Sequence, residues 1–199
     1  MAGLVKTAME NATTALLTAD LALAERVIAE DSVVDEIQHE LDARTINLIA
    51  RQSPVASDLR TLITSLRMSA DLERMGDLAH HIAKSARMRY PATAVPPELS
   101  LTIEEMGRVC SKIIEKVSTI IEKRDADRAL EVEKDDDQID GLHRKIIQTL
   151  LDPNWKHGVE TAIDMTLLGR YYERCADHAV SIARRVYFLV TGTYASDKA

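Results

Sequence analysis

The sequence has few of the residues on which sheet proteins, disulfide-bonded proteins and DNA-binding proteins depend. Aromatic residues make up only 4% of its 199 residues, with one Trp and one Phe. Strands are enriched in aromatic residues, so this scarcity argues against a β-sheet fold. Two cysteines can form neither a disulfide framework nor a zinc–thiolate cluster. The net charge of −7 is unsuited to neutralising nucleic-acid phosphates, so we expect no nucleic-acid partner.

Long apolar runs are also missing. No run approaches the roughly 18 residues that a membrane-spanning helix needs, and no secretory signal pattern precedes the first helical segment. We therefore expect a cytoplasmic protein without direct membrane insertion. The composition is 46% hydrophobic with seven Gly and five Pro, and Ala, Leu, Ile and charged residues dominate the rest. This mixture predicts an all-α fold.

Hydrophobic spacing and helix-breaking residues divide the chain into six expected helices. The first three, within a unit of residues 1–90, are 4–19, 20–51 and 59–89. Residues 91–98 are a linker, because three prolines in seven residues cannot continue a helix. The second unit, residues 99–192, contains 99–124, 126–151 and 158–190, and residues 193–199 are expected to be a frayed tail. We predict two tandem pseudo-symmetric three-helix bundles of long antiparallel helices.

Each of the two units contains one copy of each of two acidic motifs. Residues 73–77 (ERMGD) recur one hundred positions later as 173–177 (ERCAD), and flanking apolar positions share this shift. Each copy places a Glu and an Asp four residues apart, which is one turn along a single helix face. The preceding helix carries a second kind of acidic pair, repeated at a shift of 105. These pairs are Asp31 with Asp35 and Asp136 with Asp140.

Folding each helix pair back at its turn brings the two kinds of acidic pair to one level. Asp35 and Glu73 are equally distant from Pro54, as are Asp31 and Asp77. Because every helical residue rises by about 1.5 Å, residues equidistant from the turn lie side by side. In the second unit, Asp140 and Glu173 are equally distant from the turn near residues 156–157, as are Asp136 and Asp177. We define the first quartet as Asp31, Asp35, Glu73 and Asp77, and the second quartet as Asp136, Asp140, Glu173 and Asp177.

Two hypotheses explain these quartets. They are either solvated helix faces, with Arg74 and Arg174 in surface ion pairs, or oxygen-ligand sites for cations such as Fe, Zn, Mn or Mg. Four close carboxylates repel one another unless a cation or an arginine offsets their charge. His81, one turn beyond Asp77, is a candidate additional ligand.

The sequence has no phosphate-binding glycine loop, no nucleophile elbow and no Glu-x-x-His pair of a di-iron oxidase. Cys175 lies on an apolar line and is expected in the core. We therefore expect no enzyme. A metal-dependent hydrolase and a metal-storage bundle, both using the carboxylate clusters, remain as alternatives.

Residues 54–60 (PVASDLR), 72–77 (LERMGD) and 172–179 (YERCADHA) resemble the PhoU family of bacterial phosphate-transport accessory and regulatory proteins. Residues 9–12 and 184–192 resemble its actinobacterial branch. The resemblance covers nearly the whole chain and implies two three-helix bundles, a homodimer and surface metal clusters held by E(D)xxxD motifs, which match both quartets. Family chains usually begin upstream of the point that matches Met1, so we expect a shortened first helix.

The resemblance also implies a function. Members of this family repress phosphate uptake and the phosphate-starvation response. As adaptors they link the ATPase subunit of the phosphate ABC transporter to a phosphate-sensing histidine kinase. We expect the same role here, with the protein reaching the membrane only through these partners.

Overall fold

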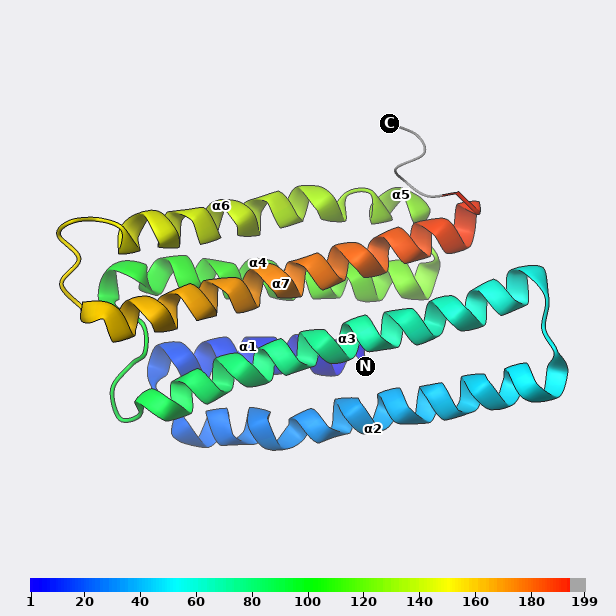
Figure 1. The fold of residues 1–199 in the computed structure, drawn as a ribbon, viewed down its shortest axis with the longest axis horizontal. Coiled ribbons are helices and arrows are strands. Elements are labelled where there is room, and N and C mark those ends of the chain that lie inside the picture. The colour runs from blue at the N-terminus through cyan, green and yellow to red at the C-terminus, as the bar shows by residue number, and fades with distance from the viewer. Residues whose placement is uncertain (194–199) are drawn as a thin grey trace.

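The computed structural model is built from two successive groups of three long helices, and the second group also contains a one-turn helix (Figure 1). The structure describes residues 1–193, and this part of the chain contains no strand. The first group is α1 (Ala2–Thr18), α2 (Leu21–Gln52) and α3 (Ala56–Arg89). The second is α4 (Pro97–Lys123), the one-turn α5 (Ala126–Ala129), α6 (Val132–Leu150) and α7 (Gly158–Thr191). The predicted all-α fold of two tandem three-helix bundles is confirmed.

Residues 90–96 join the two groups without a helix. They match the Pro-rich segment, although the division of the chain into domains at 91–98 stays a prediction. Of the tail predicted at 193–199, residues 194–199 lie outside the described part of the chain.

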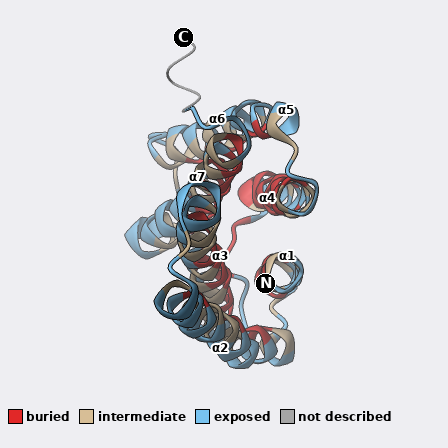
Figure 2. Ribbon diagram, turned by 90° about the vertical axis from the view of Figure 1, so that its right-hand side faces the viewer, coloured by how far each residue is buried: buried red, intermediate tan, exposed pale blue. Residues whose placement is uncertain are grey.

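The two groups pack against each other through α3 with α7 and through α1 with α4. Figure 2 shows α3 and α7 in the middle of the molecule, α1 beside α4, and α2 and α6 at opposite ends. Helix α3 contacts α1, α2 and α7, while α4 contacts α1, α6 and α7. The buried apolar residues of both groups therefore form a single core.

The first helix of each group ends in the same way, and an aspartate caps the helix that follows it. Helices α1 and α4 each end at a residue in the left-handed conformation, Ala19 and Arg124, both with φ of 51°. The next residue is an aspartate that caps the following helix. Asp20 accepts a hydrogen bond from Leu23 N at 2.9 Å, and Asp125 accepts one from Arg128 N at 3.0 Å.

The single helix expected at 126–151 is interrupted after one turn. The backbone N–H groups of Leu130 and Glu131 donate to carbonyls only three residues back, those of Asp127 and Arg128. Such bonds tighten the turn relative to an α-helix. The tightening leaves Ala129 at 4% exposure and Val132 fully buried. Packing against the core thus decides this break, which hydrophobic spacing along the chain could not predict.

Helix α1 is shorter than its counterpart, as predicted, with 17 residues against 27 in α4. The buried Leu99 and Ile103 lie in the first turns of α4, which have no equivalent in α1. At the corresponding place beside the start of α1, a largely apolar groove of about 420 Å³ is lined by residues that include Ile37, Leu41 and Met68.

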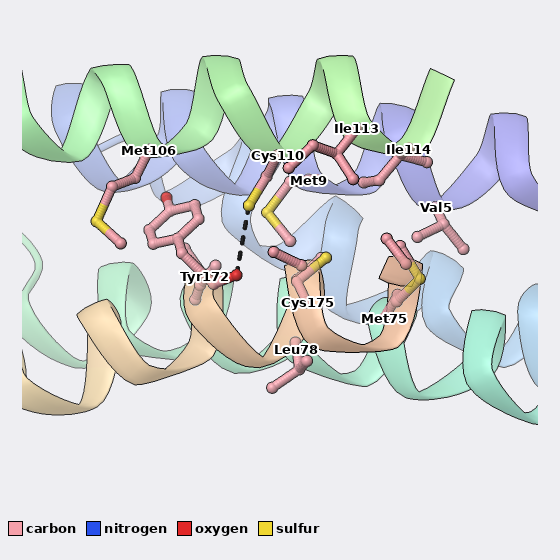
Figure 3. Packing of buried hydrophobic residues seen from close by; sticks show 14 of the residues in the cluster. Val5, Met9, Met75, Leu78, Met106, Cys110, Ile113, Ile114, Tyr172 and Cys175 are labelled. Atoms are coloured by element: carbon pink, nitrogen blue, oxygen red, sulfur yellow. Dashed lines mark hydrogen bonds between the residues drawn. The ribbon is translucent and has the colours of Figure 1, made fainter. Parts of the chain in front are cut away.

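Sulfur-containing side chains fill the centre of the core (Figure 3). Cys110 Sγ lies 3.4 Å from the carbonyl oxygen of Tyr172, to which it donates, and Cys175 lies close by. The neighbouring Cys175 and burial hold the pKa of the Cys110 thiol well above its usual value. Both thiols are about 1% exposed. Cys175 is therefore a core residue, as expected.

Candidate functional site

The first acidic motif lies where α2 and α3 run side by side. A Cβ atom placed at Gly76 would stand 3.5 Å from Asp31 Oδ1 and 3.6 Å from Val34 Cγ1. One turn further along α3, His80 Nδ1 hydrogen-bonds to Asp31 Oδ2. Asp31 therefore lies between residues 76 and 80 of α3, the level at which equal distances from Pro54 place it.

The second motif lies in the equivalent pair of α6 and α7. A Cβ atom at Gly169 would come within 2.9 Å of His143 Cδ2 and 3.4 Å of Ile146 Cδ1, so these helices approach closely. Positions 143 and 169 are equidistant from the turn near residues 156–157. The same antiparallel register is therefore present in both groups.

The carboxylates of the first quartet lie close enough to repel one another. Burial raises the pKa of Glu73, and the negative charge of Asp77 raises it further. Arg74 opposes this rise, while Asp35 and Asp31 add to it. The structure thus brings all four acids of the first quartet into one electrostatic cluster.

The second quartet is more strongly perturbed. Burial raises the pKa of Asp136 to about 6, with further contributions from Asp140 and Asp177, from the neighbouring Asp137 and from Glu173. A pKa of about 6, compared with about 4 for an ordinary aspartate, means that part of the Asp136 population carries a proton near neutral pH.

Glu173 is affected in the same direction. Burial and Asp177 raise its pKa, Arg170 and His143 lower it, and Asp140 raises it. All four members of the second quartet therefore interact, and His143 of α6 also lies within electrostatic range.

One arginine offsets part of the charge in each quartet. Arg74 Nη1 donates to Asp77 Oδ2 at 2.8 Å, and its Nε lies 3.5 Å from Glu73 Oε2. In the second quartet Arg170 donates to Glu173. The surface-pair hypothesis assigned this role to Arg174, but the structure places Arg170, one turn earlier on α7, against the glutamate.

Two buried polar atoms, one in the second quartet and one in the histidine that contacts the first, remain unpaired in the described part of the chain. Asp136 Oδ1 and His80 Nε2 are buried without a hydrogen-bond partner among residues 1–193. Within the same range, no three side chains of His, Cys, Asp or Glu converge tightly enough to hold one cation as they stand. With Arg74 and Arg170 in place, the quartets are charged clusters rather than assembled coordination spheres.

His80, rather than His81, contacts the first quartet. His81 stacks on Tyr171 of α7, with ring centroids 5.3 Å apart and planes at 19°. Both histidines follow Asp77 at a spacing compatible with one helix face, three residues for His80 and four for His81. The spacing in the sequence therefore indicates His80 as well as His81 as a neighbour of the first quartet. Which of the two faces α2 depends on how α3 is rotated in the bundle.

The chain is similar to known proteins over nearly its whole length. The model of the PhoU domain family matches residues 1–86 and 103–186. The PhoU homolog 2 of Mycobacterium tuberculosis is 45% identical over 194 residues, covering 98% of this chain and 91% of that protein. The PhoU homolog 1 of Mycobacterium leprae is 44% identical over 197 residues, covering 99% and 89%. These relatives confirm the resemblance to the actinobacterial branch.

Solved structures agree with the fold. The crystal structure of PhoU from Pseudomonas aeruginosa superposes with a TM-score of 0.87 at 29% identity, covering 97% of this chain and 93% of that one. The regulatory protein PhoU from Streptococcus pneumoniae gives a TM-score of 0.84 at 25% identity, covering 97% and 91%.

Proposed function

Because the chain belongs to the PhoU family, we propose that it is a negative regulator of phosphate uptake and of the phosphate-starvation response. Its relatives are named phosphate-specific transport system accessory proteins, which supports a role connected with phosphate transport. In this proposal the protein is not an enzyme. It acts in the cytoplasm as a homodimeric adaptor between the ATPase subunit of the phosphate ABC transporter and a phosphate-sensing histidine kinase.

The repetition of the acidic quartet carries this proposal. One quartet lies in the α2/α3 pair and the other in the α6/α7 pair, and Figure 2 places α2 and α6 at opposite ends of the molecule. An adaptor needs two separate surfaces, and two like acidic surfaces can each engage a basic partner or a cation. No helix among residues 1–193 is long and apolar enough to cross a membrane. Recruitment to membrane proteins is therefore proposed to occur through these surfaces.

Divalent or iron cations are proposed to bind at the quartets. Burial and mutual repulsion raise the pKa values of Glu73, Asp136 and Glu173, and a bound cation would offset the negative charge. Carboxylate oxygens suit Mg and Mn, and a histidine suits Zn or Fe. The unpaired Asp136 Oδ1 and His80 Nε2 are available as donors. Binding would require Arg74 and Arg170 to swing away from the acids that they now contact.

Gene deletion with complementation tests the regulatory role. We expect the deletion strain to express a phosphate-starvation reporter in phosphate-rich medium, and the unchanged gene to restore repression. A quadruple charge reversal should fail to restore it, because the acidic surfaces would then repel basic partners and cations. The four changes are Glu73→Lys, Asp77→Lys, Glu173→Lys and Asp177→Lys. Circular dichroism checks that this variant remains helical.

A matched variant controls for the change in total charge. It reverses four exposed acids outside the quartets and should repress the reporter normally. These residues are Glu25, Glu30, Glu104 and Asp127. Normal repression by the folded quartet variant would show that the quartets are not the working surfaces. A reporter that stays silent in the deletion strain would contradict the regulatory role itself.

A further inference from the structure

A basic pocket lies between α3 and α7, outside both quartets. Its volume is about 280 Å³. Four arginines and two hydroxyl residues line it, together with the apolar side chains of Ile63 and Phe188. These six residues are Arg60, Thr64, Arg67, Ser181, Arg184 and Arg185. Such a concentration of guanidinium groups stands out in a chain whose net charge is −7.

Two of the four arginines have no acidic partner within the part of the chain that the structure describes. Arg185 Nε donates to Asp71 Oδ2 at 3.0 Å, and Arg184 pairs with Glu133 at 2.8 Å. In contrast, no carboxylate between residues 1 and 193 lies within ion-pair distance of Arg60 or Arg67. The Arg60 guanidinium instead lies 5.1 Å from the centroid of the Phe188 ring. The pocket therefore carries positive charge that the described chain does not neutralise.

The hydroxyl groups of the pocket also lack hydrogen-bond partners among the described residues. Thr64 is only 6% exposed, yet it makes no hydrogen bond through its side chain to any residue in the described range, and neither does Ser181. Neighbouring hydroxyls on α3 behave differently. Thr61 and Ser65 each donate to the carbonyl four residues back, at 2.9 Å. Thr64 Oγ1 is not among the fully buried atoms without a partner, so it remains accessible from the pocket that Thr64 lines and can hydrogen-bond to an external group.

The equivalent position in the second repeat carries acidic side chains that the basic pocket lacks. The shift of one hundred residues that relates the two acidic motifs makes Glu160 the equivalent of Arg60 in the second repeat, and Asp164 the equivalent of Thr64. There the acids are matched from within the chain, because Arg89 Nε donates to Asp164 Oδ2 at 2.6 Å and Arg89 also pairs with Glu160. In the basic pocket the carboxylates are replaced by an arginine and a hydroxyl. The negative charge that would balance the pocket has to come from outside the described residues.

We propose that this pocket binds a small phosphate-bearing anion, either inorganic phosphate or a phosphate ester. Guanidinium groups bind phosphate oxygens through paired N–H donors, and hydroxyl groups add further hydrogen bonds. A carboxylate offers two oxygens, whereas a phosphate group offers at least three for the donors of both helices. Phe188 and Ile63 provide apolar contact for the organic part of an ester. The inference stands on the pocket alone and does not depend on the proposed regulatory role.

Titration calorimetry on the purified full chain tests the proposal. Inorganic phosphate, adenosine monophosphate and acetate are titrated at constant ionic strength with a chelator present, so that no cation at the quartets binds the phosphate. We expect saturable binding of one or both phosphate probes and not of acetate. Binding of inorganic phosphate or of the nucleotide alone identifies which source of phosphate the pocket accepts. The combined change Arg60→Gln and Arg67→Gln should weaken binding at least tenfold.

Two further variants keep the test decisive. Arg51→Gln with Arg87→Gln removes the same charge from exposed positions outside the pocket and should change affinity less than twofold. Thr64→Val keeps the charge and shape but removes the unpartnered hydroxyl, so it should weaken binding severalfold without lowering the melting temperature. It also carries the test if the double arginine variant does not fold. No binding of either phosphate probe, equal binding of acetate, or equal weakening by both double arginine variants would overturn the proposal.

Discussion

Thr13 Oγ1 and Tyr172 OH lie 2.8 Å apart in the core, although 159 residues separate them in the chain. Thr13 also donates to the carbonyl of Met9 at 2.8 Å. Because a hydroxyl has one proton, Tyr172 is the donor between the two. Tyr172 is fully buried (Figure 3). This bond joins α1 of the first group to α7 of the second, so the two pseudo-symmetric halves share one polar contact inside one core.

Removing that contact should weaken the fold measurably. Tyr172→Phe deletes one buried hydrogen bond and leaves the Thr13–Met9 bond intact, so we expect the free energy of unfolding to fall by about 1 kcal/mol. Urea denaturation followed by circular dichroism measures it. Tyr171→Phe is the matched control, because its described contact is ring stacking with His81, which phenylalanine retains. Equal effects of the two changes would mean that the bond does not couple the halves.

Two glycine-to-alanine changes should differ in their effect on stability. A Cβ atom at Gly107 would stand 2.5 Å from Thr13 Cγ2, so Gly107→Ala forces α1 and α4 apart. Overpacking of this kind costs about 1–3 kcal/mol. At Gly76 the nearest atom is 3.5 Å away, and the second repeat has alanine there, Ala176. Gly76→Ala should leave stability unchanged or raise it by about 0.5–1 kcal/mol. Thermal melts compare the two, and a lower melting temperature for Gly76→Ala would contradict the register of α2 and α3.

Asp136 should make the metal-free fold more stable in mild acid. Its pKa is raised to about 6 in the folded protein, above the unfolded value near 3.9. Between these values the folded state binds more protons, so stability rises as pH falls from 7 toward 4.5. After allowance for solvent screening we expect an effect of order 1 kcal/mol.

Asp136→Asn isolates this contribution. The variant should be more stable than the unchanged protein at pH 7.5, and this difference should shrink as the pH falls below 6. Denaturation in the presence of a chelator, at several pH values, measures both proteins under identical conditions. The contribution of Glu73, which lies in the other quartet, then cancels in the difference, whereas any change in Glu173, which interacts with Asp136, remains part of it. A difference independent of pH would show that Asp136 titrates normally.

Neutralising the first quartet should separate repulsion from ion pairing. Glu73→Gln with Asp77→Asn removes two repelling charges, so the metal-free melting temperature should stay the same or rise slightly. Stabilisation by an added divalent cation should fall at the same time. A ligand that binds only the folded state at 100 times its Kd contributes about 2.7 kcal/mol. If the variant instead melts well below the unchanged protein without cation, the acids are structural partners of Arg74.

The helices and the register of the quartets could be predicted from the sequence because both depend on local geometry. Apolar spacing, prolines and capping aspartates mark helix ends, and a constant rise per residue converts distance from a turn into a level in the hairpin. The repeat then extended the argument for Asp31 and Glu73 to Asp136 and Glu173. The interruption at residues 130–131 escaped this reasoning, since it arises from the packing of Ala129 and Val132 on the core.

By itself, the sequence determined the helical class, the family and which carboxylates would share a level. The tertiary structure decided which neighbours those carboxylates meet, placing His80 and Arg170 against the quartets and His81 on Tyr171. It also decided that Arg60 and Ser181 line one pocket, although 121 residues separate them. The physical reason is that these contacts depend on how each helix is rotated about its axis and where α3 lies along α7. Spacing within a single helix contains no information about either.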